Sequence, residues 1–162
     1  AADWTALTTG QRELVAAADV AVVMIGPAVV TSETLANCRP GAAIAWIVKN
    51  DPAALPPELT AELRRRASLI FHNASESSLV EGVPAAPAQL VVRTDGPRPV
   101  TVTTQDGCRS YPIPPVATVG NPTGAGDTFA AGFLAAWVRS TAEAECVAAG
   151  AAAARLRIET FP

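Results

Sequence analysis

Short apolar runs rich in Val and Ile alternate along this chain with amphipathic or alanine-rich segments. The strands that these runs predict cover 20–25, 43–48, 68–71, 89–93, 100–104 and 108–113. The helices that the remaining segments predict cover 11–18, 31–37, 58–66, 74–80, 125–139 and 142–156. Strands and helices that alternate in this way build βαβ units, in which helices cover a parallel sheet. The pattern therefore predicts an α/β, doubly wound fold with a mostly parallel sheet flanked by helices.

The length of the chain suits one domain, residues 1–162. At 162 residues with 49% hydrophobic and 17% charged side chains, the chain can bury a sizeable core. A net charge of -3 provides no basic surface, so neither nucleic acid nor a membrane is an expected partner. The apolar stretch 129–138 is too short to span a membrane, and no signal peptide is evident, so the cytoplasm is the default location.

A turn of small residues at 121–129 leads straight into an apolar segment, with Asp127 at the junction. A helix start carries backbone N–H groups without intrahelical partners and the positive end of the helix dipole. Gly124 and Gly126 would let an anion approach these amides, because glycine has no side chain. The segment therefore predicts a phosphate site with Asp127 beside it as a base. A purely structural role in capping the helix and shaping the turn is the alternative.

These nine residues resemble the C-terminal motif of the ribokinase-like (PfkB-type) carbohydrate kinases. The resemblance implies that Asp127 is the catalytic base. It also implies an anion hole for the γ-phosphoryl group of ATP, built by the amides of Ala125, Gly126 and Asp127 in the turn that contains Gly124. The implied fold is the three-layer ribokinase core. Some relatives bind a monovalent cation through an Asp near this turn, where this chain has Asn121, so potassium dependence stays open.

A second similarity lies upstream, where Asn73 and Glu76 match the family's Asn-x-x-Glu motif. In that family the motif helps to hold Mg²⁺ and the nucleotide phosphates, which implies that Glu76 acts on the metal indirectly, through water. The segment 46–59 also resembles the part of ribokinase that leaves a central strand and enters a helix. A capping box between Asn73 and Glu76 explains the same spacing without any ligand.

Two further nucleotide contacts are implied by the resemblance. The segment 90–96 resembles a strand followed by a loop that contacts the nucleotide phosphates, which assigns Thr94 and Gly96 to that loop. An ordinary hairpin turn is the alternative there. The small residues around Gly150 resemble the helix that forms part of the adenine pocket, and close helix packing is the alternative for this glycine.

The resemblance covers nearly the whole chain but corresponds to the back half of the family fold. The front section, with its Gly-Gly sugar-recognition motif and β-sheet lid, has no counterpart in these residues, so the chain is either a fragment or a short relative. The lid would supply most acceptor contacts and the surface for a possible homodimer. The acceptor therefore stays open, and the isolated chain could be inactive.

The predicted function is an ATP-dependent phosphotransferase that phosphorylates an alcohol group of a sugar, sugar phosphate or nucleoside. The alternatives are a non-catalytic nucleotide- or protein-binding module on the same fold, and a vitamin kinase for pyridoxal or hydroxymethylpyrimidine. Other classes fit poorly. The chain has no P-loop motif, its Gly-Ala-Gly turn lacks the third glycine of a Rossmann motif, and His72 has no Gly-x-Ser-x-Gly partner.

Overall fold

The computed structural model describes residues 6–80, 86–116, 121–139 and 142–160. Within these residues, six strands form a single sheet in the order β1-β2-β3-β4-β5-β6. Their bounds are Val20–Val23 (β1), Ala43–Ile47 (β2), Leu69–Asn73 (β3), Leu90–Thr94 (β4), Val100–Thr104 (β5) and Gly107–Tyr111 (β6). The first four strands pair in parallel, whereas β5 and β6 join as an antiparallel extension. The predicted α/β fold is confirmed.

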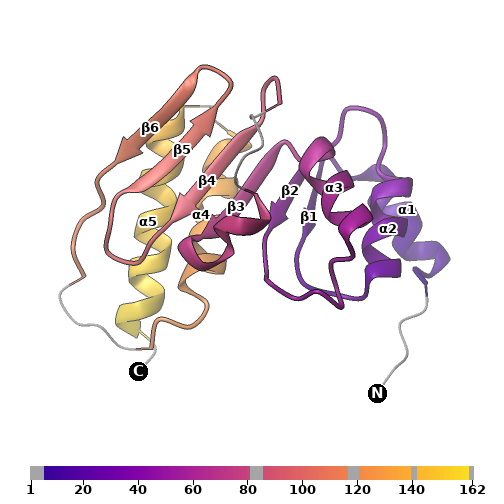
Figure 1. The fold of residues 1–162 in the computed structure, drawn as a ribbon, viewed down its shortest axis with the longest axis horizontal. Coiled ribbons are helices and arrows are strands. Elements are labelled where there is room, and N and C mark those ends of the chain that lie inside the picture. The colour runs from indigo at the N-terminus through magenta and orange to yellow at the C-terminus, as the bar shows by residue number, and fades with distance from the viewer. Residues whose placement is uncertain (1–5, 81–85, 117–120, 140–141, 161–162) are drawn as a thin grey trace.

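Helices cover both faces of this sheet, as Figure 1 shows. Their bounds are Thr9–Ala17 (α1), Ala28–Asn37 (α2), Pro57–Arg66 (α3), Ala125–Trp137 (α4) and Glu143–Thr160 (α5), with a 3₁₀ helix at Ala74–Leu79 (η1). The α2 and α3 helices pack on one face, and α4 and α5 pack on the other. This arrangement is the expected three-layer core.

Strand β2, which has a neighbouring strand on each side, shows why the sheet is covered on both faces. Ala45 and Ile47 belong to the core cluster under α4 and α5. Ile44 and Trp46 belong to the other cluster, under α2 and α3. Side chains alternate between the two faces of a strand, so a run that is apolar at every position is stable only between two helical layers.

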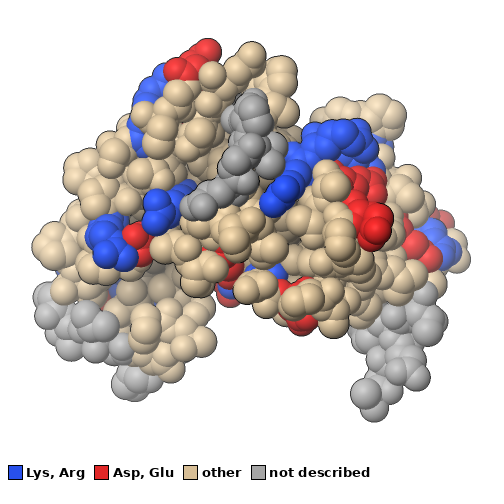
Figure 2. All heavy atoms as spheres, in the orientation of Figure 1, with Lys and Arg blue, Asp and Glu red and all other residues tan. Residues whose placement is uncertain are grey.

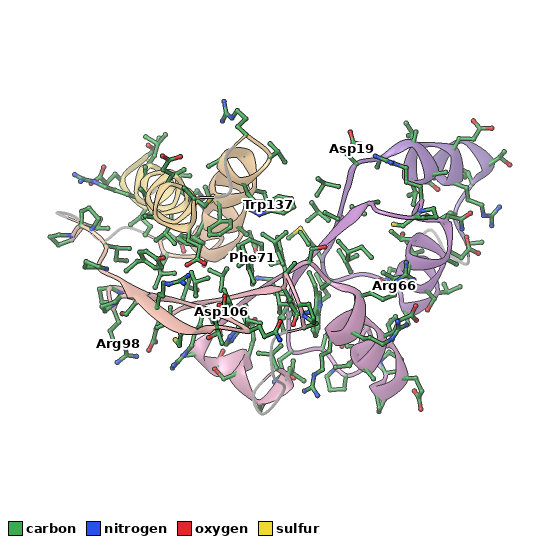
Figure 3. The ribbon with its side chains drawn as sticks, turned by 90° about the horizontal axis from the view of Figure 1, so that it is seen from above. Asp19, Arg66, Phe71, Arg98, Asp106 and Trp137 are labelled. Atoms are coloured by element: carbon green, nitrogen blue, oxygen red, sulfur yellow. The ribbon has the colours of Figure 1, made fainter. Side chains whose placement is uncertain are left out.

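Aromatic rings fill the larger of the two cores. Phe133 of α4 is 0% exposed and meets Phe71 of β3 edge to face, with 5.2 Å between ring centroids. The ring centroid of Phe129, one turn earlier on α4, lies 6.2 Å from that of Phe133. Figure 3 shows Phe71 near the middle of the molecule, toward the side where α4 lies. These contacts fix α4 on the sheet, and with it the position of its first turn.

Several predicted boundaries are wrong by a few residues. The first strand ends at Val23 rather than at 25, and α2 begins at 28, directly after Pro27, which is its N-cap. The segment predicted as a helix over 74–80 is a 3₁₀ helix of six residues. The last helix continues to 160, past the predicted end at 156. Element ends depend on caps and tertiary contacts, which apolar periodicity does not report.

Charged side chains of both signs are scattered over the face shown in Figure 2. One basic group lies over α3, whose last turn carries Arg64, Arg65 and Arg66. Acidic side chains lie next to this group, so this face has no continuous basic surface. No helix in the described part of the chain is long and apolar enough to cross a membrane.

Close packing of α4 on α5 depends on glycine at position 132. A Cβ atom placed there would lie 2.7 Å from the carbonyl oxygen of Ala149 and 2.7 Å from the Cβ of Ala153. The backbone of α5 would have to move to make room. We therefore expect Gly132→Ala to lower the free energy of unfolding by about 1–3 kcal/mol, the usual cost of overpacking.

Chemical denaturation of the natural protein that carries this chain measures this difference. Gly10→Ala is the matched control, because a Cβ atom at Gly10 in α1 meets nothing within 4 Å. Equal unfolding midpoints for Gly132→Ala and Gly10→Ala would contradict the packing described for α4 and α5.

Candidate active site

A cleft lies at the carboxyl ends of β2, β3 and β4, where the first turn of α4 meets the sheet. The residues that line it are Ile47, Val48, Lys49, Phe71, His72, Asn73, Glu76, Thr94, Gly126, Asp127 and Phe129. Ligands of open α/β sheets bind at this edge, because loops that follow parallel strands converge there. Five of the predicted site residues therefore lie in one cleft: Asn73, Glu76, Thr94, Gly126 and Asp127.

The start of α4 supplies two free backbone donors. Gly124 is the N-cap, with φ at 81°, a left-handed conformation that favours glycine. The amide of Ala125 donates to the carbonyl of Pro122 at 3.0 Å, and the amide of Thr128 donates to the carbonyl of Gly124 at 2.9 Å. The amides of Gly126 and Asp127 have no partner among the described residues. The expectation of three open amides is thus corrected to two, because the Ala125 amide closes the turn.

The cleft has open space beside Gly126. A Cβ atom placed on Gly126 meets nothing within 4 Å, although the residue lines the cleft. Packing within the protein therefore gives no reason for glycine at this position. A ligand that approaches the amides of Gly126 and Asp127 would explain the glycine, because a methyl group would occupy the space beside these amides.

Asp127 lies in the first turn of α4 with its carboxylate at the cleft. Its Oδ1 atom is buried and forms an ion pair with Nζ of Lys49 at 2.7 Å. Lys49 follows β2, so the pair links the sheet edge to the start of α4. No role for Lys49 was predicted from the sequence. A polar residue directly after a buried strand, at the edge where ligands bind, is the signal that could have identified it.

Asn73 and Glu76 hold each other in a capping box at the start of η1. Oδ1 of Asn73 accepts hydrogen bonds from the amides of Ser75 at 2.8 Å and Glu76 at 3.1 Å. Oε2 of Glu76 accepts one from the amide of Asn73 at 2.9 Å. The structural alternative for this motif is therefore present, yet both side chains also line the cleft. Oε1 of Glu76 takes no hydrogen bond from any described residue, so this oxygen is available to a ligand.

Thr94 and Gly96, the two residues expected in the nucleotide loop, lie in different places in the structure. Thr94 ends β4 and lines the cleft, whereas Gly96 is absent from the lining and lies in the turn toward β5. That turn is closed by Asp95, whose carbonyl accepts from the amide of Arg98 at 3.1 Å. A hydrogen bond from the Arg98 side chain also lowers the pKa of the Asp95 carboxyl. The hairpin alternative therefore describes Gly96, whose φ of 57° suits the turn.

Gly150 is a packing residue of the α4–α5 interface. A Cβ atom there would lie 2.8 Å from the carbonyl oxygen of Phe129 and 2.9 Å from its ring. The residue is buried and does not line the cleft. The packing alternative accounts for the glycine, because Phe129 occupies the space beside it, and the contact with the nucleotide stays a prediction.

The oxygen donors in the cleft suit a magnesium ion that is held mainly by phosphates and water. No cluster of three or more His, Cys, Asp or Glu side chains able to hold a metal occurs within the described ranges. Mg²⁺ usually keeps several waters and takes only one or two carboxylates together with substrate phosphates. The free Oε1 of Glu76 fits this mode of binding. Asn121, the residue considered for a monovalent cation, uses Oδ1 to accept from the amide of Thr123 at 2.9 Å.

The fold and the cleft together define an α/β protein in which a helix start meets the ends of parallel strands at one cleft. The chain belongs to the pfkB family of carbohydrate kinases, whose sequence profile it matches over residues 11–161. This membership confirms the family resemblance found in the sequence.

Individual relatives agree with the family match. A cytidine kinase from Thermococcus kodakarensis is 34% identical in an alignment of 111 residues that covers 60% of this chain and 39% of that protein. Adenosine kinase from Schistosoma mansoni, solved with 2-fluoroadenosine, superposes with a TM-score of 0.76 at 19% identity over 93% of this chain. Ribokinase from Arabidopsis thaliana, solved with ribose and ATP, gives a TM-score of 0.73 at 23% identity over 96% of this chain.

The chain spans only part of these relatives. It covers 53% of the Schistosoma adenosine kinase and 54% of the Arabidopsis ribokinase. The structural similarity therefore shows that the chain has the fold of about half of each kinase.

Proposed function

We propose that the protein carrying this chain transfers the γ-phosphate of ATP to an alcohol group of a sugar, sugar phosphate or nucleoside. The amides of Gly126 and Asp127, which have no partner among the described residues and lie next to a carboxylate at the end of a parallel sheet, are the observation that carries the proposal. Phosphoryl transfer needs little covalent chemistry from the protein, and it depends on positioning and on stabilising charge. A helix start that presents amides and a base to one cleft meets both needs.

In this proposal each cleft residue has one task. The amides of Gly126 and Asp127 donate hydrogen bonds to the oxygens of the transferring phosphoryl group. Asp127 accepts the proton of the acceptor hydroxyl as the oxygen attacks phosphorus. Glu76, fixed by the amide of Asn73, orients water that would hold Mg²⁺ beside the phosphates. Bound magnesium would neutralise the phosphate charge. Thr94 also lines the cleft and offers a hydroxyl to the nucleotide.

The acceptor is best sought among the ligands named for the relatives. Cytidine kinase, adenosine kinase and ribokinase bear names that point to nucleosides and ribose. We therefore place these compounds first in an acceptor panel, followed by sugar phosphates, pyridoxal and hydroxymethylpyrimidine. The natural full-length protein is incubated with each compound, magnesium and γ-labelled ATP, and labelled product is measured.

The proposal expects label transfer to at least one nucleoside, sugar or sugar phosphate. Transfer only to pyridoxal or hydroxymethylpyrimidine would replace it with a vitamin kinase. Tight ATP binding without transfer to any acceptor in the panel would replace it with a non-catalytic nucleotide-binding module.

The open space at Gly126 gives a specific prediction. We expect Gly126→Ala to lower kcat/KM for ATP at least about 10-fold, because the added methyl would displace phosphate from the amides that hold it. Folding should not suffer, since alanine is favoured over glycine in a helix by about 1 kcal/mol. Steady-state kinetics and thermal unfolding of the same preparations measure the two effects.

Gly10→Ala again serves as the control, since it introduces the same methyl group in α1, outside the cleft. Unchanged kinetics for Gly126→Ala would show that no phosphate approaches this turn. A large loss of stability would show instead that the protein itself requires the glycine.

A further inference from the structure

Lys49 is fixed at the edge of the sheet by its neighbours. The amide of Val48 donates to the carbonyl of Phe71 in β3 at 2.8 Å, and the Val48 side chain is 1% exposed. The carbonyl of Lys49 accepts from the amide of Asp51 at 2.9 Å. Backbone bonds on both sides therefore hold the start of the Lys49 side chain in place. Its ammonium group reaches across the cleft to the first turn of α4.

The two oxygens of the Asp127 carboxylate have different surroundings. Oδ1 is buried, accepts no hydrogen bond from a described residue, and has the Lys49 ammonium at 2.7 Å. The Asp127 side chain as a whole is nevertheless 37% exposed. The exposed surface of the Asp127 side chain is therefore on its other atoms, which include Oδ2. One oxygen is held by Lys49, and the other side of the carboxylate faces solvent.

Lys49 also offsets one of the two negative charges in the cleft. Among the residues that line it, Lys49 is the only Lys or Arg, and Glu76 and Asp127 are the acidic members. Lys49 is also the only lysine in the chain. Ion pairs exposed to this degree add little to folding stability, so stability alone is a weak reason for the pair.

We propose that Lys49 is a positioning residue for phosphoryl transfer, which holds Oδ1 of Asp127 so that Oδ2 receives the acceptor proton. The inference rests on the proposed kinase function. In the transfer, the acceptor oxygen forms a bond to the γ-phosphorus while its proton moves to Oδ2. The bond between the γ-phosphorus and the β–γ bridging oxygen breaks, and ADP leaves. Lys49 keeps its own proton throughout and fixes the orientation of the base.

Kinetics of the natural protein test this role with Lys49→Met and Lys49→Arg. Lys49→Met should lower kcat at least about 10-fold, because small misplacements of a reacting group are costly, and should change KM for ATP less than about 3-fold. Lys49→Arg should recover part of the loss, since it keeps a cation. The control is Arg12→Met, which breaks the Arg12–Glu33 ion pair of 3.0 Å outside the cleft and should leave kcat unchanged.

A double variant separates positioning from an independent role. If Lys49 acts through Asp127, Lys49→Met should lower the residual single-turnover rate of Asp127→Asn by less than about 3-fold, as expected for residues that act as a unit. If Lys49→Met lowered the rate of Asp127→Asn as much as it lowers the rate of the wild type, the proposal would be overturned. An unchanged kcat for Lys49→Met in a protein that transfers phosphate would also overturn it. A wild-type protein that transfers nothing would instead overturn the proposed kinase function.

Chemical labelling tests the ion pair without any turnover. The protein is treated with limiting acetic anhydride, and acetylation of Lys49 is followed by peptide mass spectrometry. Asp127→Asn should raise the rate of Lys49 acetylation, because the amine loses its anionic partner. Glu33→Gln, which removes the partner of Arg12, is the control and should not change the rate. Equal rates in wild type and Asp127→Asn would contradict the ion pair on which the inference rests.

Discussion

Replacement of Asp127 by asparagine should lower kcat by about 100-fold to 10,000-fold, the range that a positioned acid or base contributes to enzyme catalysis. The substitution keeps the size of the side chain and its place in the first turn of α4, but it removes the oxygen that takes the acceptor proton. ATP affinity should stay within about 3-fold, because the backbone amides that hold the phosphate remain in place. Initial rates and isothermal titration with ATP measure the two quantities on the natural protein.

Asp106→Asn is the matched control for this experiment. Asp106 is an exposed carboxylate in the turn between β5 and β6, outside the cleft, and its replacement should leave kcat unchanged. If Asp127→Asn retained wild-type turnover, the proton would have to leave by another route, and the assignment of the base would be wrong.

Removal of the Phe133 ring should be the most damaging change to the core among those considered. The side chain is fully buried and contacts the rings of Phe71 and Phe129, so it joins α4 to the sheet. We expect Phe133→Ala to lower the free energy of unfolding by about 3–5 kcal/mol, the usual cost of deleting a buried aromatic ring. Natural domains are stable by only about 5–15 kcal/mol, so this loss is a large part of the total.

Urea denaturation of the natural protein measures this loss. Leu14→Ala is the control, because Leu14 of α1 is 73% exposed and its removal should change stability by less than about 0.5 kcal/mol. Similar midpoints for the two variants would contradict the position of α4 on the sheet, on which the geometry of the cleft depends.

Much of the fold could be predicted from local sequence, because apolar periodicity reports directly which faces are buried. Strand β2 is apolar at every position and lies at 43–47, close to the predicted 43–48. The first strand was predicted to include Met24 and Ile25, which are 41% and 55% exposed and lie outside β1. These residues are apolar without being part of the core, and an apolar run alone does not reveal where backbone pairing ends.

The candidate site could be predicted only in part, because a motif names residues but not their partners. The sequence identified Asp127 and Gly126, and the structure places both in the cleft. It could not show that Phe129 fills the space beside Gly150, since that contact joins two helices. The role of Lys49 was missed for a similar reason. Its partner lies 78 positions later in the chain, and only the folded sheet brings the two together.

A crystal structure of the natural protein with magnesium, ADP and aluminium fluoride, a mimic of the transferring phosphoryl group, is the most direct test of the account. We predict fluoride atoms about 2.7–3.1 Å from the amide nitrogens of Gly126 and Asp127, the distance expected for donors that stabilise a transition state. The Asp127 carboxylate should face the open side of the aluminium. Nucleotide bound elsewhere, with these two amides still free, would contradict the phosphoryl site proposed at the start of α4.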